Sequence, residues 1–408
     1  MQDSGRRHGW LIVTVLAATL GLHNGSRIGP ASLIDELRVR FEVDYGGVGN
    51  LIGAYTLTYA FAQLSAGFLT DRFGSRRLLL TGLGLMAVGS ATFALAPSYS
   101  VALLGRWTMG IAGGCLYTPA VALCFAAFQR SARGRAMAYA QSGTGAGLVL
   151  SISVLPVLYE VVGLTGAFLV YPVLAGVLWL AVWRFLPGPV AERHNSRAGL
   201  SGLIRSRDFW LLLIGFAFIG MLAQSAVLSW VATYLRSTYG WTAVEAGFAG
   251  GLVAAGLMVF PAPFGMLADR IGNRRRIMLV GCGLGLAGWT TLLAATDPRV
   301  AIGGALLVSA SMAATIPMQA VYASERFSNV GSGTAVGLVN TGAQIAQALA
   351  APLYGALLDQ GFGFAAIWTT TVLLGVVRSG AVLLLGEPRL TPQRDETVRP
   401  SAVDPATR

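Results

Sequence analysis

Charge is what this chain has little of. Only 12% of its 408 residues are charged, against about 25% in soluble domains. Hydrophobic residues make up 54%, and the mean hydropathy is +0.64. This composition excludes a soluble globular or disordered chain. Lysine is absent, so arginine supplies all 29 basic residues and the net charge of +11. Most arginines lie in short segments between apolar runs, which indicates a lipid bilayer rather than nucleic acid as the partner.

Cysteine is also scarce. Cys115, Cys124 and Cys282 all fall inside apolar runs, and their odd number and wide spacing argue against a disulfide framework or a zinc site. Motifs of hydrolases, metalloproteases and nucleotide-binding loops do not occur. We therefore expect no enzyme activity, no metal and no cofactor, with any energy coming from an ion or solute gradient.

Apolar runs long enough to cross a bilayer, about 20 residues each, occur twelve times. They lie at about 10–33, 46–70, 78–97, 99–127, 135–159, 163–186, 209–235, 243–268, 277–296, 299–323, 332–358 and 364–386. With both termini in the cytoplasm, 22 arginines face inward and four face outward. Because positive charge is retained inside, this predicts a multi-pass protein of the cell (inner) membrane with cytoplasmic termini.

An internal repeat divides the chain. The segment Gly67-Phe-Leu-Thr-Asp-Arg-Phe-Gly-Ser-Arg-Arg77 recurs 198 residues later as Gly265-Met-Leu-Ala-Asp-Arg-Ile-Gly-Asn-Arg-Arg275. An even number of spans per repeat makes the two halves parallel. We expect an N-terminal six-helix bundle, a basic cytoplasmic linker, a C-terminal six-helix bundle and a cytoplasmic tail, at residues 1–186, 187–208, 209–386 and 387–408.

The repeated loop resembles the signature loop of the major facilitator superfamily, and Arg106-Trp-Thr-Met-Gly110 resembles its second motif. The resemblance implies an all-α fold of twelve transmembrane helices in two pseudo-symmetric bundles, and secondary transport by alternating access. It also implies a gating latch, although the loop arginines could serve only as a topological anchor. The implied gating residues are Gly67, Asp71, Arg72, Gly74, Arg76, Arg77, Arg106, Gly265, Asp269, Arg270, Gly272, Arg274 and Arg275.

Arg27 lies deep in the first span, and none of the 18 acidic residues falls in the middle of a span. A buried cation without counter-charge is costly unless it is functional. A guanidinium also suits bidentate contact with a carboxylate or phosphate. We therefore predict an anionic substrate, although Arg27 could instead satisfy helix carbonyls or reach external water. Arg106 and Arg378 are expected to snorkel toward the membrane surfaces.

Segments beginning at Arg27 and Gly134 resemble the organic-anion branches, namely anion:cation symporters and monocarboxylate carriers, which favours a small monocarboxylate. His23 is the one intramembrane group that titrates near neutral pH, so it is the candidate carrier of a coupled proton. Co-transport of a proton or cation, uniport and exchange stay open, as do a drug or sugar exporter and a non-transporting sensor. We expect a monomer. The candidate substrate-binding residues are Arg27, His23, Asn24, Tyr59, Tyr117, Gln141, Gln224, Gln319, Asn340 and Gln344.

Overall fold

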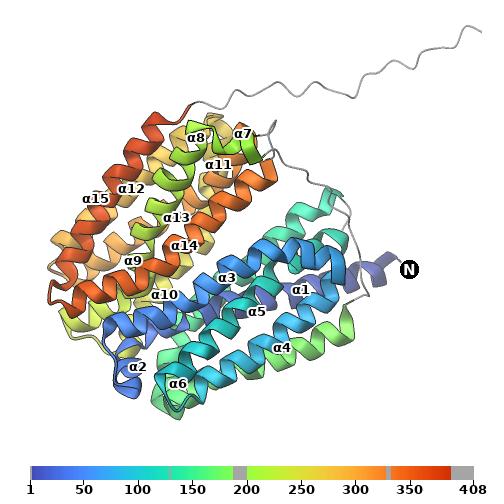
Figure 1. Ribbon diagram of the computed structural model, residues 1–408, viewed down its shortest axis with the longest axis horizontal. Helices are drawn as coiled ribbons and strands as arrows, with labels where there is room; N and C mark the ends of the chain where they lie inside the picture. The colour runs from blue at the N-terminus through green and yellow to red at the C-terminus, as the bar shows by residue number, and fades with distance from the viewer. Residues whose placement is uncertain (1, 128–129, 187–199, 328–331, 387–408) are drawn as a thin grey trace, which may run out of the picture.

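The computed structural model describes residues 2–127, 130–186, 200–327 and 332–386, and all regular structure within them is helical (Figure 1). The predicted linker and tail therefore lie largely or wholly outside the described residues. The helices of the N-terminal part are α1 (Gln2–Ile28), η1 (Gly29–Ser32), α2 (Ile34–Phe41), α3 (Tyr45–Phe73), α4 (Ser75–Ala94), α5 (Tyr99–Ala127) and α6 (Arg130–Phe185). Those that follow are α7 (Leu200–Ile204), α8 (Arg207–Trp210), η2 (Leu211–Phe218), α9 (Ile219–Tyr239), α10 (Ala243–Val259), α11 (Pro261–Ile271), α12 (Arg274–Ala294), α13 (Pro298–Arg326), α14 (Ser332–Asp359) and α15 (Gly363–Leu384).

Nine helical segments of the described chain are long and apolar enough to cross a membrane. One of them, Arg135–Phe185, covers most of α6, which breaks at Gly163, where φ is +71°, and so comprises two antiparallel crossings. Helices α3 and α14, with 29 and 28 residues, are also long enough but carry several amides and hydroxyls. With these additions the helices account for the twelve predicted spans, and the all-helical polytopic fold is confirmed.

Three local features depart from the predicted spans. Helix α2 is a short amphipathic helix between the first two crossings, with Asp35 and Glu36 in its first turn. The predicted span 243–268 is two helices, because Pro261 begins α11 directly after α10. The seventh crossing begins with eight residues of π-helix, η2, an irregularity that hydropathy does not reveal.

The helices form two bundles that meet along two helix pairs (Figure 1). In the first pair, α3 packs antiparallel on α14: a Cβ at Gly49 or Gly53 would lie 2.6 or 2.3 Å from the carbonyl oxygens of Ala351 or Ala348. The second pair is α6 with α10, where Gly247 meets Pro156. Small residues permit this approach, as is usual for helices in lipid. We call the two pairs the α3–α14 seam and the α6–α10 seam.

The two bundles are joined at one end and separated at the other. At the end that carries α2, a Cβ at Gly355 would lie 2.6 Å from the carbonyl oxygen of Tyr45. At the opposite end, which carries the signature loops, a Cβ at Gly67 or Gly265 would meet no atom within 4 Å. Figure 1 shows the bundles diverging in this direction. These two glycines therefore have no close neighbour in this conformation, which is closed at the α2 end and open at the signature-loop end.

Candidate functional site

Arg27 lies between the two bundles. It is in the last turn of α1 and is partly exposed, and its Nη1 donates a hydrogen bond to Gln347 Oε1 of α14 at 3.2 Å. Its Nε is buried and has no hydrogen-bond partner. No ion pair joins Arg27 to a carboxylate of the described residues. The guanidinium thus contacts the opposite bundle through one neutral amide and retains unused donor capacity.

An aromatic cluster packs beside Arg27 on the N-terminal bundle. The Tyr55 hydroxyl lies 2.8 Å from His23 Nδ1 and donates to the His23 carbonyl oxygen at 3.0 Å, which is satisfied when Nδ1 carries the ring proton. The Tyr59 ring packs on the imidazole with 4.8 Å between centroids. His23 is 1% exposed and Tyr59 is 3% exposed. These two candidate binding residues are thus packed within the N-terminal bundle.

Arg106 does not snorkel, so that prediction is wrong. Its side chain is fully buried, and it donates to the carbonyl oxygens of Ser26, Arg27 and Leu51 at 2.7, 2.8 and 2.8 Å. Ser26 and Arg27 belong to the last turn of α1, whose carbonyls lack helical partners. Arg106 therefore caps α1 and ties it to α3, which fixes the position of Arg27.

One face of α14 supplies amides to the interface between the bundles. Asn340, Gln344 and Gln347 follow the helical spacing i, i+4, i+7. Asn340 Nδ2 donates to Gln63 Oε1 of α3 at 3.2 Å, and Gln344 Oε1 is buried without a partner. Sequence reasoning found the first two but missed Gln347 and Gln63. Gln347 could have been found, because it continues the same periodic face.

The hydrogen bonds that the structure gives the other candidates stay within their own bundle. Asn24 Nδ2 lies 3.5 Å from Thr144 Oγ1, and Gln141 Nε2 lies 3.2 Å from the Tyr117 hydroxyl. In the C-terminal bundle, Gln224 is 1% exposed and donates to hydroxyls of α13, and Gln319 is 7% exposed. Within the described part of the chain, no hydrogen bond joins either of these last two residues to Arg27. The structure thus groups Arg27 with Gln347, not with Gln224 or Gln319.

Two polar contacts hold the α2 end closed, and sequence reasoning missed both. Arg236 of α9 makes a bidentate pair with Glu36 of α2 at 2.8 and 3.0 Å and lies 3.2 Å from Asp35. The Asp359 carboxylate, at the end of α14, accepts from the backbone amides of Tyr45 and Gly46 at 2.9 and 2.7 Å. Asp359 thereby caps the N-terminus of α3 from the opposite bundle. Nothing in the local sequence signals either contact.

Burial raises the pKa of the Asp35 carboxyl above its ordinary value, although Arg236 and Arg38 nearby act in the opposite direction. Asp35 lies in α2, between the first two crossings. Its carboxylate is therefore held at the closed end of the interface at a desolvation cost.

The signature loops are apart. Asp71 and Arg72 are exposed, and no ion pair joins Asp71 to a described residue. The side chain of Asp269 lies outside those that are described. Gly74 and Gly272 adopt φ of +82° and +67° and end their helices. The remaining predicted positions, Arg77 and Arg270, are exposed.

Other loop arginines make equivalent contacts in the two bundles. Arg76 donates to the Trp183 carbonyl oxygen near the end of α6, and Arg275 Nε donates to that of Val382 near the end of α15 at 3.0 Å. Both cap helix C-termini. Arg274 pairs with Glu325 at 3.3 Å. These contacts lie within one bundle and so do not link the two.

Arg378 also does not snorkel. It is 2% exposed, its guanidinium lies 4.4 Å from the Phe216 ring centroid, and its Nε and Nη1 are buried without partners. The π-helical segment η2 contains Phe216, and Gly220 lies two residues after its end, at a position where a Cβ would clash with Arg378 Nε. The close approach of α9 and η2 to α15 encloses the side chain before it can reach a membrane surface.

The comparisons with known proteins agree with this fold. Residues 9–262 and 231–405 match the family model described as Major Facilitator Superfamily, so the chain belongs to that superfamily. It is therefore an integral multi-pass membrane protein and a secondary transporter of small molecules, not an enzyme. In a structural comparison it aligns with the nucleoside transporter NupG at a TM-score of 0.78 and 12% identity, over 91% of this chain and 99% of that one.

The similar curated proteins carry different substrates. The chain is 25% identical to the "Probable L-galactonate transporter" of Escherichia coli, over 61% of this chain. It is 24% identical to "Probable anion transporter 4, chloroplastic" of Arabidopsis thaliana, over 71% of this chain. These matches span 59% and 61% of the relatives' own lengths. It is 28% identical to "Tetracycline resistance protein, class G" of Vibrio anguillarum, over 88% of this chain and 89% of that protein. The comparisons establish the family and leave the substrate class unresolved.

Proposed function

We propose that the protein carries a small organic anion, with a monocarboxylate as the best fit, and that Arg27 binds it. The observation that supports this is the Arg27 guanidinium, which lies at the interface of the bundles and has a neutral amide as its one side-chain partner among the described residues. A carboxylate can replace Gln347 Oε1 and use Nε as well, which is the bidentate geometry that guanidinium favours. Two of the curated relatives are named for an anion or a sugar acid.

The alternating-access cycle follows from the contacts at the two ends. We propose that the signature-loop end is cytoplasmic, as the arginine distribution predicts, so the present conformation is inward-open. The Glu36–Arg236 pair and the Asp359 cap form the outer gate. In the outward-open state these contacts separate, and Asp71 and its counterpart Asp269 close the cytoplasmic end against the loop arginines.

A coupled proton, if the carrier uses one, has His23 as its nearest titratable neighbour on α1. The imidazole is packed against Tyr55 and Tyr59 and is 1% exposed, so it has almost no direct exposure. Transport by a His23→Gln variant that keeps its dependence on a pH gradient would show that the proton travels with the substrate instead.

The test is uptake of radiolabelled monocarboxylates into proteoliposomes by Arg27→Ala, Arg27→Lys and the unmodified protein. Loss of one charge-assisted contact of about 1.5–3 kcal/mol predicts a rise in KM of about 10- to 100-fold for Arg27→Ala. Arg27→Lys should recover part of this, because it restores the charge without the bidentate geometry. Arg299→Gln removes an exposed arginine outside the interface and serves as the control. Unchanged uptake by Arg27→Ala would refute the anion assignment.

Efflux of an uncharged or cationic amphiphile is the second candidate. The interface offers amides and phenols such as Asn340, Gln344 and Tyr117 without a fixed carboxylate among the described residues, and the tetracycline resistance protein matches over most of the chain. Resistance conferred on a sensitive host that survives Arg27→Ala would favour this function. Resistance absent while monocarboxylate uptake depends on Arg27 would favour anion transport.

A further inference from the structure

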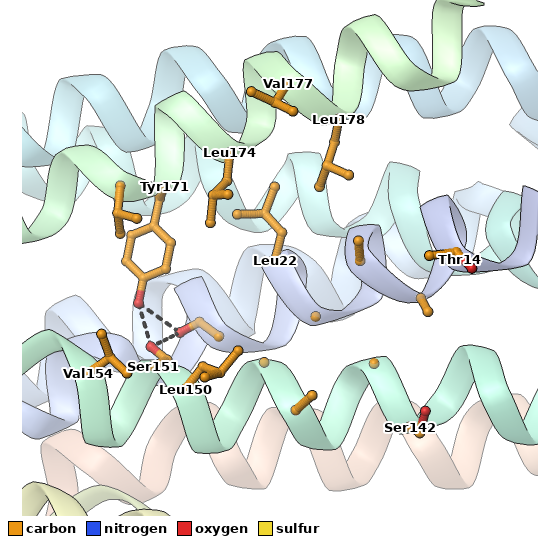
Figure 2. A pocket seen from close by; sticks show the side chains of 18 of the residues that line it. Thr14, Leu22, Ser142, Leu150, Ser151, Val154, Tyr171, Leu174, Val177 and Leu178 are labelled. Carbon is orange, nitrogen blue, oxygen red and sulfur yellow. Dashed lines mark hydrogen bonds between the residues drawn. The ribbon is translucent and has the colours of Figure 1, made fainter. Parts of the chain in front are cut away.

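A cavity that Arg27 does not line lies in the N-terminal bundle, between α1 and the two halves of α6. Its volume is about 610 Å³. Figure 2 shows Leu22 of α1 and Leu174, Val177 and Leu178 of the second half of α6 directed into it. Close contact of α1 with the first half of α6 forms the floor, where a Cβ at Gly147 would lie 2.1 Å from the Gly21 carbonyl oxygen. We call this cavity the α1–α6 groove.

The polar groups of the groove satisfy one another. The Ser151 hydroxyl donates to the Gly25 carbonyl oxygen at 2.8 Å and contacts the Tyr171 hydroxyl, which donates to the same carbonyl at 3.2 Å (Figure 2). Two further hydroxyls of the lining are engaged locally, since Thr14 Oγ1 donates to the Trp10 carbonyl oxygen at 2.9 Å and Ser142 Oγ donates to that of Tyr139 at 2.7 Å. Apart from Tyr139, the rest of the lining consists of glycine, aliphatic side chains and Met258. A polar or charged occupant would find few free partners, so the groove suits a hydrocarbon.

The rim of the groove faces the bilayer. Leu150, Leu174 and Val177 are 60, 44 and 57% exposed on a chain that spans the membrane, so lipid tails are the medium that surrounds them. From Tyr139 to Leu158 the groove follows α6 for about 28 Å at 1.5 Å per residue, close to the hydrocarbon thickness of a bilayer. A methylene occupies roughly the 30 Å³ of a water molecule, so the cavity holds about 20 of them. This volume matches one acyl chain, and the groove is longer than the roughly 15 Å of one leaflet, so such a chain fits within it.

We propose that the α1–α6 groove binds one acyl chain of a bilayer phospholipid. Met258 of α10 also lines the groove and is 51% exposed, and a Cβ at Gly145 would lie 2.9 Å from Met258 Cβ. The bound acyl chain would therefore contact both bundles at the α6–α10 seam. Because the hydrocarbon makes the contacts, chain length governs binding and the headgroup does not.

Native mass spectrometry of the purified full-length protein tests this, with dioleoyl and dioctanoyl forms of phosphatidylglycerol and phosphatidylcholine as probes. The unmodified protein should retain one dioleoyl lipid more than Ala18→Phe, which fills the floor of the groove at an exposed position. Ala365→Phe, at an exposed alanine on α15 outside the groove, should retain the same number as the unmodified protein. Leu174→Gln, on the exposed rim, provides a second variant should Ala18→Phe fold poorly.

Equal retention by Ala18→Phe, Leu174→Gln and Ala365→Phe would overturn the proposal. Equal retention of dioctanoyl and dioleoyl lipids, or of only one headgroup, would also overturn it. Displacement of the lipid by tetraphenylphosphonium, with loss of its transport in Ala18→Phe, would make the groove a substrate site instead. None of these results depends on whether Arg27 binds an anion, so the two proposals fail separately.

Discussion

The Glu36–Arg236 pair should set the balance between the conformation described here and the opposite one. Arg236 contacts Glu36 through two hydrogen bonds at 2.8 and 3.0 Å, and the two side chains are 21 and 10% exposed. An exposed pair would contribute less than about 1 kcal/mol, whereas a charge-assisted bidentate contact of this burial contributes about 2 kcal/mol. The pair joins α2 to α9 and can exist only while the α2 end is closed. Breaking it should therefore move the conformational equilibrium by about 30-fold toward opening at that end.

The assay is electron paramagnetic resonance distance measurement with two spin-label pairs. Labels at Leu95 and Phe362, both exposed near the α2 end, report its opening, and labels at Phe73 and Ile271 report closure at the signature-loop end. The native cysteines are buried, so they compete little for the label. In Glu36→Gln and in Arg236→Ala the first distance should lengthen as the second shortens.

Controls separate the pair from a general loss of charge. Arg299→Gln removes an exposed arginine that makes no cross-bundle ion pair in the described chain, and it should leave both distances unchanged. The double variant of Glu36 and Arg236 should shift the equilibrium no further than Arg236→Ala alone, because that substitution already removes the contact with Glu36. Unchanged distances in Arg236→Ala, or fully additive effects, would show that the pair does not hold the end closed.

Three further outcomes are expected. Gly53→Ala should push apart the α3–α14 seam and lower the free energy of unfolding by about 1–3 kcal/mol, measured as a fall in melting temperature. Gly84→Ala should be neutral, because a Cβ there would meet no atom within 4 Å. Equal melting shifts in the two variants would contradict the packing argument. Arg378→Met should be neutral or stabilising by about 1–4 kcal/mol in the same melting assay, because two buried donors lack partners; strong destabilisation would reveal a contact not seen here. The pKa of Asp35 is raised mainly by burial in the closed state, so the closed state binds its proton more tightly and gains stability as pH falls through that pKa. Acidification should therefore shorten the distance between the spin labels at the α2 end, and Asp35→Asn should abolish that response. A response of the opposite sign would show that protonation of Asp35 does not favour closure.

The candidate site was only partly predictable from sequence. Arg27 stands out because a cation in an apolar run is costly, and Asn340 and Gln344 because they share a helical face. Gln347 continues that face and could have been found. Its contact with Arg27 could not, because the two residues are 320 positions apart.

Arg106 and Arg378 show why depth alone misleads. Each lies within reach of a membrane surface by helix length, which predicts snorkelling. The fold instead surrounds Arg106 with carbonyls at the end of α1 and places Arg378 against Phe216. Whether a long side chain reaches water depends on the neighbouring helices, and its own helix does not specify them.

Hydropathy was sufficient for the twelve crossings, because the bilayer requires each crossing to satisfy its own backbone within one helix. The resemblance of the repeated loop to a known signature motif indicated the family. Those signals are local or periodic, so a single sequence carries them. The tertiary structure alone decided which end of the molecule is closed, that Asp359 caps α3 and that Glu36 meets Arg236. These contacts join residues about 200 to 314 positions apart in different bundles. They depend on how the two bundles are placed relative to each other, and alternating access requires the same sequence to permit more than one such placement.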